Sequence, residues 1–357
     1  MNRDDQACVF LDNLVKKHKS PGLQYLLILN GATRFVKQAG YSEFESGKMV
    51  TQKSSFNACS VTKTFTSLAV MQLVEQGKLK LSDNLADFFP DYPFSTEITI
   101  QQLLSHTSGL PNPIPLRWAH LQEEDADFNF DEFISTVLKA HSRLKSKPGE
   151  KFKYSNLNYL ALGKIIEKIS GTSYKQYIRE NIFSKINPGE YPLDFQVPDE
   201  SNYARGYQKR FSFFTLILGL FLDKKKFTEP SSNKRWLRFR KYYVNGTSYG
   251  GLIANAHSLS EFIQCLFKEG SVLLSDEYKR ILLTRRQIAS GKKAEMTLGW
   301  FTGKLGGNDY FTHAGAGGGY YCEMRIYPGL NMISAIMFNR SGMNDERFLD
   351  KIDHYFI

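Results

Sequence analysis

The sequence predicts a mixed α/β (α+β) fold: an antiparallel sheet flanked by helices and built from both ends of the chain, with a mainly helical lobe inserted between them. Near the N-terminus, residues 24–29 and 34–38 flank Asn30-Gly31, a strong signal for a tight hairpin turn. Near the C-terminus, residues 297–301, 310–312, 320–327 and 332–338 have the pattern of consecutive antiparallel strands. A helix is expected to close the chain from about residue 345 to residue 354.

The clearest helix in the middle of the chain begins at Ser60. Phe65, Leu68 and Leu73 recur at helical spacing, and Gly77 is the expected stop. At 357 residues, the chain is long enough to bury a substantial core. We predict a single domain over residues 1–357, with a sheet lobe of residues 1–60 and 245–357 and a helical lobe of residues 61–244. The helical lobe would contain a basic and apolar insertion at residues 209–241.

The start of this helix carries the first chemical motif, S-x-x-K from Ser60 to Lys63. Residues three apart on a helix lie one above the other, so the Lys63 amine can lie beside the Ser60 hydroxyl and take its proton. The same spacing recurs from Ser142, Ser231 and Ser290, but in basic, polar or glycine-marked stretches. A serine at a helix start also leaves its own backbone N–H free to donate to a developing oxyanion. Ser60 is therefore the candidate nucleophile.

A second motif, Y-x-N, runs from Tyr154 to Asn156, and the same spacing recurs from Tyr243 to Asn245. The first copy follows the turn signal Lys-Pro-Gly at residues 147–149 and precedes a long helical pattern. The sequence therefore favours Tyr154.

With these motifs, the sequence resembles the serine β-lactamase and penicillin-binding-protein superfamily, in its class C-like branch of β-lactamases, D,D-peptidases and esterases. The resemblance runs from about residue 21 to residue 342, except at 209–241, and includes GKLKLSD at 77–83, LLSHTSGLP at 103–111, GGL at 250–252, LGW at 298–300 and GAGGG at 315–319. It implies a β-lactamase-like fold and no metal or other cofactor. It implies these site residues: Ser60 as acylated nucleophile, Lys63 and Tyr154 as the proton-transfer pair, the N–H groups of Ser60 and Ala316 as the oxyanion hole, and Asn156 at the substrate's acyl side.

Chemistry alone does not choose the base, because lysine and tyrosine both titrate near pKa ~10 when unperturbed. A nearby ammonium favours the tyrosinate, whereas burial disfavours the ammonium. Either Lys63 or Tyr154 can therefore be the base.

His313-Ala314-Gly315 occupies the substrate-aligning edge, where typical β-lactamases and D,D-peptidases carry Lys-Thr-Gly. Histidine near pKa ~6.5 is mostly neutral at pH 7 and is a weaker anchor for a substrate carboxylate than lysine. We therefore expect His313 and Gly315 to bind esters or uncharged amides. A nearby K-x-G at Lys304 is not followed directly by an apolar strand, whereas His313 introduces the strand pattern at 320–327.

Two other residues, Ser248 and Cys59, are possible nucleophiles. Ser248 lies in Gly246-Thr-Ser-Tyr-Gly250, which matches the G-x-S-x-G elbow of α/β-hydrolases, and Asp276 or Asp309 with His313 would complete a triad. However, no helix pattern follows this motif directly, and no alternating strand and helix units precede it. Cys59 adjoins Ser60 but has no lysine one helical turn away.

The cysteines and the N-terminal residues indicate the cellular environment that we expect for the protein. The four cysteines are widely spaced and form no C-x-x-C, so they signal neither a zinc site nor a disulfide framework. The N-terminus carries acidic residues and lacks the apolar core of a secretory signal, which predicts a cytoplasmic protein, peripheral on a membrane at most.

Residues 209–241 depart from the family pattern. They contain ten basic and two acidic residues, a net charge of +8 in a chain of +10. The mostly apolar run at 211–222 is too short to span a bilayer, which needs about 20 residues. Apolar residues flanked by cations suit docking on an anionic membrane, and a buried helix next to a solvated basic face is the alternative. Nucleic acid is a weaker partner, because aromatic and basic residues alternate only over 235–243.

The sequence therefore predicts a serine hydrolase that acts through an acyl-enzyme on Ser60, an esterase or amidase for a small-molecule or lipid-like substrate. A β-lactamase or D,D-peptidase is the nearest alternative. A non-catalytic member that binds an acyl ligand and docks on membranes is the second.

Overall fold

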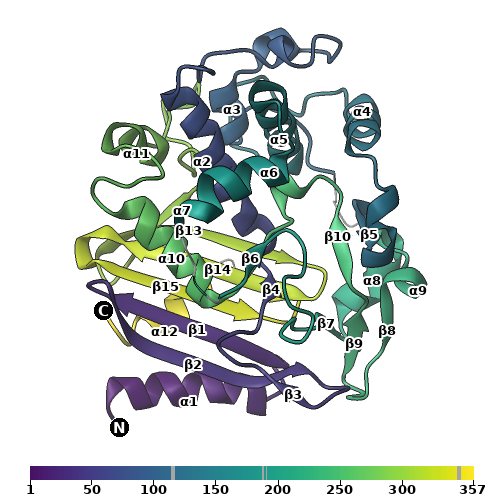
Figure 1. Ribbon diagram of the computed structural model, residues 1–357, viewed down its shortest axis with the longest axis vertical. Coiled ribbons are helices and arrows are strands. Elements are labelled where there is room, and N and C mark those ends of the chain that lie inside the picture. The colour runs from purple at the N-terminus through teal and green to yellow at the C-terminus, as the bar shows by residue number, and fades with distance from the viewer. Residues whose placement is uncertain (114–116, 187–188, 190, 344–346) are drawn as a thin grey trace.

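The computed structural model of the protein describes residues 1–113, 117–186, 189, 191–343 and 347–357 (Figure 1). At its centre lies a seven-stranded antiparallel sheet with the order β12-β13-β14-β15-β1-β2-β3. Its strands are β1 (Gly22–Leu29), β2 (Ala32–Glu43), β3 (Lys48–Met49), β12 (Phe301–Leu305), β13 (Asn308–Gly317), β14 (Tyr320–Tyr327) and β15 (Met332–Phe338). Because β1 pairs with β15, with Leu26 opposite Ala335, the two ends of the chain form one sheet, as the sequence predicted.

Helices cover both faces of this sheet (Figure 1). On one face, α1 (Arg3–Lys16) and α12 (Asp350–Asp353) pack into a cluster with Tyr25 and Ile336. On the other face, α10 (Ala256–Phe267) packs on β1 and β15, and its Phe262 stacks on Phe65 of α2 (Thr62–Glu75) with ring centroids 3.9 Å apart. The further helices of this layer are α3 (Ile100–Leu104), α4 (Phe130–Ala140), α5 (Asn156–Ser170), α6 (Tyr174–Ile178), α7 (Ser184–Ile186) and α11 (Asp276–Leu283).

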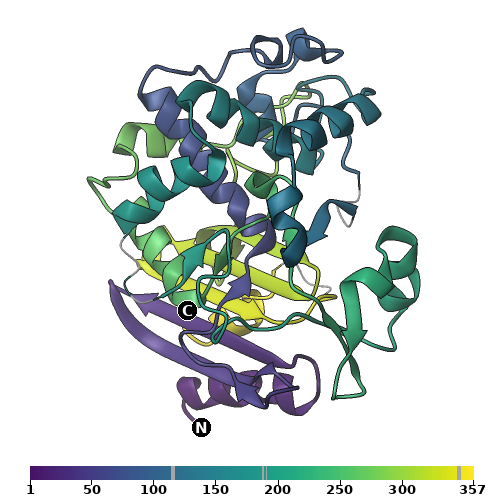
Figure 2. The same cartoon turned by 45° about the vertical axis from the view of Figure 1, so that its right-hand side comes forward.

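The middle of the chain also contributes short strands, so it is less uniformly helical than expected. They form three small sheets: β5 (Ala119–Leu121) with β10 (Tyr242–Val244); β4 (Phe56–Asn57), β11 (Ile253–Ala254) and β6 (Leu193–Asp194); and β7 (Tyr207–Lys209), β9 (Trp236–Phe239) and β8 (Thr228–Pro230). Helices α8 (Phe213–Phe221) and α9 (Lys224–Phe227) accompany the third sheet, and this part projects from the side of the molecule in Figure 2. The predicted division into two lobes stays a prediction.

Two expected elements differ in the structure. The strand expected at 297–301 is wrong for residues 297–300, which form a turn. Only Phe301, where β12 begins, lies in a strand. Gly299 adopts φ +102°, and a Cβ there would lie 2.1 Å from Ser67 Oγ, so the chain turns where the apolar pattern suggested a strand. The helix expected over 345–354 is shorter, Asp350–Asp353, and residues 345 and 346 lie outside the described residues.

Candidate active site

Ser60 lies in a short 3-10 turn, Cys59–Val61, that leads directly into α2. The α-helix itself begins at Thr62, yet Lys63 still follows Ser60 by one turn, as the motif required. Cys59 adopts φ +49°, a left-handed conformation that is uncommon outside glycine. Backbone strain of this kind gathers at functional sites, where the surrounding structure holds it in place.

Strand β13 passes directly against this turn. A Cβ on Gly315 would lie 2.3 Å from the carbonyl oxygen of Ala58 and 2.8 Å from the backbone nitrogen of Ser60. Glycine is therefore required for the strand to approach, and Gly315 acts through the backbone, not through contact with the cavity. Ala316, the next residue, lines the same cavity as Ser60. This places the two predicted oxyanion-hole residues on opposite elements of one site.

The Lys63 side chain is fully buried and has three polar neighbours. Its Nζ lies 3.1 Å from Ser60 Oγ, 2.8 Å from Asn156 Oδ1 and 2.6 Å from the carbonyl oxygen of Tyr249. Burial lowers the pKa of the ammonium well below its ordinary value. A neutral amine has two hydrogens and one lone pair, and the two oxygens of Asn156 and Tyr249 only accept. In the neutral form of Lys63, the lone pair is therefore left for the hydroxyl hydrogen of Ser60, which is the arrangement that a general base needs.

Tyr154 lies beside this amine, with its ring centroid 5.0 Å from Lys63 Nζ. Its ring packs at a tilt of 30° against that of His106, with centroids 4.3 Å apart. His106 Nδ1 accepts from the backbone N–H of Ser155 at 3.1 Å and from Asn158 Nδ2 at 3.0 Å. His106 thus holds the segment that carries Tyr154, a role that the LLSHTSGLP pattern signalled only as part of the family resemblance.

Asn156, His313 and Gly315 are the predicted substrate-binding residues, and of these three the structure places Asn156 on the cavity. Asn156 lines the cavity and also orients Lys63, and its own amide donates to Asn112 Oδ1 at 3.1 Å. His313 is fully buried, and neither it nor Gly315 is among the residues that line the cavity. Burial, with the positive charge of Lys63, lowers the pKa of His313 to about 3. His313 is therefore a buried, neutral residue that does not line the cavity.

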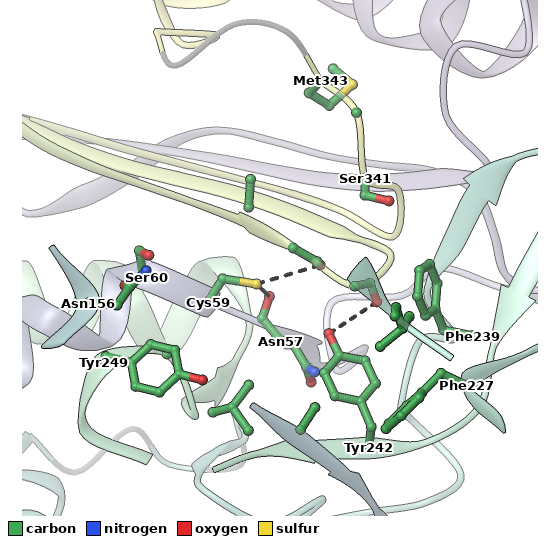
Figure 3. A pocket seen from close by; sticks show the side chains of 18 residues that line it. Asn57, Cys59, Ser60, Asn156, Phe227, Phe239, Tyr242, Tyr249, Ser341 and Met343 are labelled. Carbon is green, nitrogen blue, oxygen red and sulfur yellow. Dashed lines mark hydrogen bonds between the residues drawn. The ribbon is translucent and has the colours of Figure 1, made fainter. Parts of the chain in front are cut away.

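The cavity next to Ser60 has a volume of about 420 Å³ (Figure 3). Ser60, Asn156 and Ala316 line it. It is also lined by a mostly apolar group of side chains: Leu222, Phe227, Phe239, Tyr242 and Val244. In Figure 3, Phe227, Phe239 and Tyr242 lie across the cavity from Ser60 and Asn156. None of the 18 described residues that line it is charged. Sequence reasoning missed this wall, because its residues come from the insertion and from β10, which match no family motif. It also missed the Tyr249 carbonyl, since a backbone group has no sequence signal.

The competing nucleophiles do not have a comparable setting. Ser248 is buried, its Oγ donates to the carbonyl of Tyr159 at 2.9 Å, and the chain continues from it into β11 instead of a helix. Burial raises the pKa of the Cys59 thiol to about 12, which keeps it protonated. Lys304, in the alternative K-x-G, ends in an ion pair with Asp309 at 3.2 Å. Among the described residues, no group of three or more His, Cys, Asp or Glu gathers where it would hold a metal ion.

The fold and this site define a β-lactamase-like protein. The model of the Beta-lactamase family matches residues 10–354, and the chain belongs to this family. It is 33% identical over 183 residues to Protein flp of Staphylococcus aureus (strain MW2), which is 49% of this chain and 35% of that protein. The chain thus matches only about a third of the length of that relative.

Solved structures show the same fold. The octameric penicillin-binding protein homologue from Pyrococcus abyssi superposes with a TM-score of 0.78 at 24% identity, covering 98% of this chain and 76% of that chain. D-amino acid amidase from Ochrobactrum anthropi SV3 superposes with a TM-score of 0.78 at 18% identity, covering 99% of this chain and 98% of that chain.

Proposed function

We propose that this protein is a serine hydrolase that forms an acyl-enzyme on Ser60 and acts on small uncharged esters or amides with an apolar group. One observation carries the proposal: the buried amine of Lys63 lies 3.1 Å from Ser60 Oγ. Its other two polar neighbours, Asn156 Oδ1 and the carbonyl oxygen of Tyr249, can only accept hydrogen bonds. Family membership adds support, since a β-lactamase, an amidase and penicillin-binding proteins are among the proteins that resemble this chain.

In the proposed reaction, Ser60 Oγ attacks the substrate carbonyl carbon while its proton passes to the Lys63 amine. The carbonyl oxygen becomes an oxyanion and accepts hydrogen bonds from the N–H groups of Ser60 and Ala316. When the tetrahedral intermediate collapses, the alcohol or amine leaves with the proton held by Lys63. Tyr154, whose ring centroid lies 5.0 Å from Lys63 Nζ, is the second candidate for this proton transfer. Water then hydrolyses the acyl-enzyme and restores Ser60.

The cavity lining favours uncharged substrates over β-lactams and D-Ala-D-Ala peptides. Those substrates carry a carboxylate, and a desolvated carboxylate needs a cation or several donors near it. Among the residues that the structure describes, none of the 18 that line the cavity is charged, and His313, which takes the place of the family's lysine, is buried and neutral. The apolar wall instead suits an alkyl or aromatic group of the substrate. The cytoplasmic location expected from the sequence stays a prediction.

Intact-mass detection of a fluorophosphonate adduct tests the nucleophile on the wild type, Ser60→Ala and Ser248→Ala. We expect one adduct on the wild type and on Ser248→Ala, and none on Ser60→Ala. Turnover of p-nitrophenyl acetate and octanoate, compared with a chromogenic cephalosporin, then tests the substrate class, and esters should be preferred. An adduct that persists on Ser60→Ala would refute the assignment, and a wild type without any adduct would indicate the non-catalytic binding protein.

A further inference from the structure

The insertion at 209–241 presents a patch of exposed apolar side chains at the start of α8. Phe211, Phe213 and Leu216 are 86%, 77% and 78% exposed, which makes them the most exposed large apolar residues in the described part of the chain. Single apolar residues on a surface are ordinary, but three within six positions form a patch. We call these three residues the α8 patch.

The α8 patch lies on the part of the chain that projects from the side of the molecule (Figure 2). The same projection reaches the active-site cavity, because Leu222 and Phe227, which follow α8, both line it. One short element therefore connects an exposed apolar surface with the apolar wall beside Ser60.

Cations without carboxylate partners accompany the patch. Of the ten basic residues at 209–241, four form ion pairs among the described residues: Lys226, Arg238, Arg240 and Lys241. The other six form none there: Lys209, Arg210, Lys224, Lys225, Lys234 and Arg235. The backbone N–H of Arg210 donates to the carbonyl of Arg235 at 2.9 Å, so two of these residues lie side by side at the start of the patch.

Other parts of the chain add positive charge at the same place. Partial burial, with the charges of Arg340 and Lys19, lowers the pKa of Lys209. Arg340 in turn donates to the carbonyl of Lys19, so cations from three separate segments meet next to the segment that begins α8. Mutual repulsion of this kind is relieved when an anionic surface binds.

We propose that the α8 patch, with the adjoining cations Lys209 and Arg210 and the exposed Lys225 of the same insertion, docks the protein on an anionic lipid surface. The apolar side chains would enter the interface between headgroups and acyl chains, and the cations would contact the headgroups. The helix lies on the bilayer: α8 has nine residues, and among the described residues no helix is long and apolar enough to cross a membrane. A nucleic acid would satisfy the same cations but would leave Phe213 and Leu216 in water.

Flotation with phosphatidylcholine vesicles, with and without phosphatidylserine, tests this docking. The wild type should float with the phosphatidylserine vesicles and lose most of this binding in high salt. Replacing Phe211, Phe213 and Leu216 together by Ser should weaken partitioning by more than about tenfold, because burial of a single large apolar side chain contributes about that factor. Arg210→Ser with Lys225→Ser should weaken it roughly 25-fold, at a factor of about five for each cation.

Matched controls separate this surface from general stickiness. Val9, Met49 and Val272 are also exposed, at 46%, 53% and 64%, and their combined replacement by Ser should leave vesicle binding unchanged. Equal weakening in this control, binding that does not depend on phosphatidylserine, or full binding by the α8-patch variant would each overturn the proposal. Binding of a short RNA without any vesicle binding would overturn it in favour of nucleic acid.

This docking goes beyond the proposed hydrolase and is measured independently of it. Ser60→Ala should float as the wild type does, and the α8-patch variant should keep the wild-type rate of fluorophosphonate labelling without vesicles. A wild type that floats with vesicles but is not labelled by the fluorophosphonate would refute the hydrolase alone. A wild type that is labelled but does not float would refute the docking alone.

Discussion

Replacing Lys63 by methionine tests the chemistry of the site most directly. The change keeps an unbranched side chain of similar length in a fully buried position but removes the amine that lies 3.1 Å from Ser60 Oγ. A positioned general base contributes about 10²–10⁴-fold, or roughly 3–5 kcal/mol of activation free energy. We therefore expect fluorophosphonate labelling to slow by at least about a hundredfold.

The structure also sets the expected effect on stability. Methionine leaves Asn156 Oδ1 and the Tyr249 carbonyl without the hydrogens that Lys63 donates, at a cost of about 1–3 kcal/mol for each buried acceptor. Removal of a buried amine that is costly to desolvate offsets part of this loss. We therefore expect Lys63→Met to remain folded and to unfold cooperatively in urea. If it does, slow labelling results from the lost amine and not from a loss of the folded structure.

Lys63→Arg and the pH profile make the reasoning refutable. A guanidinium keeps the donors but stays protonated, so Lys63→Arg should be as slow as Lys63→Met. In the wild type, the base is active when deprotonated, so the labelling rate should rise with pH and then level off. The midpoint of this rise should lie well below pH 10.5, because burial lowers the pKa of Lys63. A midpoint near 10.5, or less than about tenfold slowing in folded Lys63→Met, would contradict the assignment.

Two further predictions follow from the neighbouring strand. Gly315→Ala should slow labelling and lower the free energy of unfolding by about 1–3 kcal/mol, because the new Cβ would lie 2.3 Å from the backbone of the Ser60 turn. Gly329→Ala is the matched control, because a Cβ there would have no atom within 4 Å. Equal effects of the two substitutions would refute the packing argument. His313 has a pKa near 3 when folded, so the unfolded state binds its proton first, and stability should fall as the pH drops from about 6.5 towards 3. His313→Gln should reduce this slope by on the order of 1.4 kcal/mol per pH unit in urea unfolding, and an unchanged slope would show that His313 titrates normally.

Local patterns in the sequence were sufficient for much of the fold. The strands at 320–327 and 332–338 coincide with β14 and β15, because alternating and apolar runs bounded by turns leave few other conformations. The pattern failed at 297–301, where Gly299 turns the chain against Ser67. That turn depends on a contact between residues more than 200 positions apart, which no local pattern reports.

By itself, the sequence indicated the family, the pairing of the two chain ends in one sheet, the candidate nucleophile Ser60, and Lys63 and Tyr154 as the two candidates for the base. Each of these depends on spacing along the chain, which a motif records directly. The tertiary structure decided the electrostatics: burial lowers the pKa values of Lys63 and His313 and removes His313 from the cavity wall. It also brought together the mostly apolar part of the cavity lining: Leu222, Phe227, Phe239, Tyr242 and Val244. The solvation of a side chain and the walls of a cavity depend on segments that meet only in the folded protein.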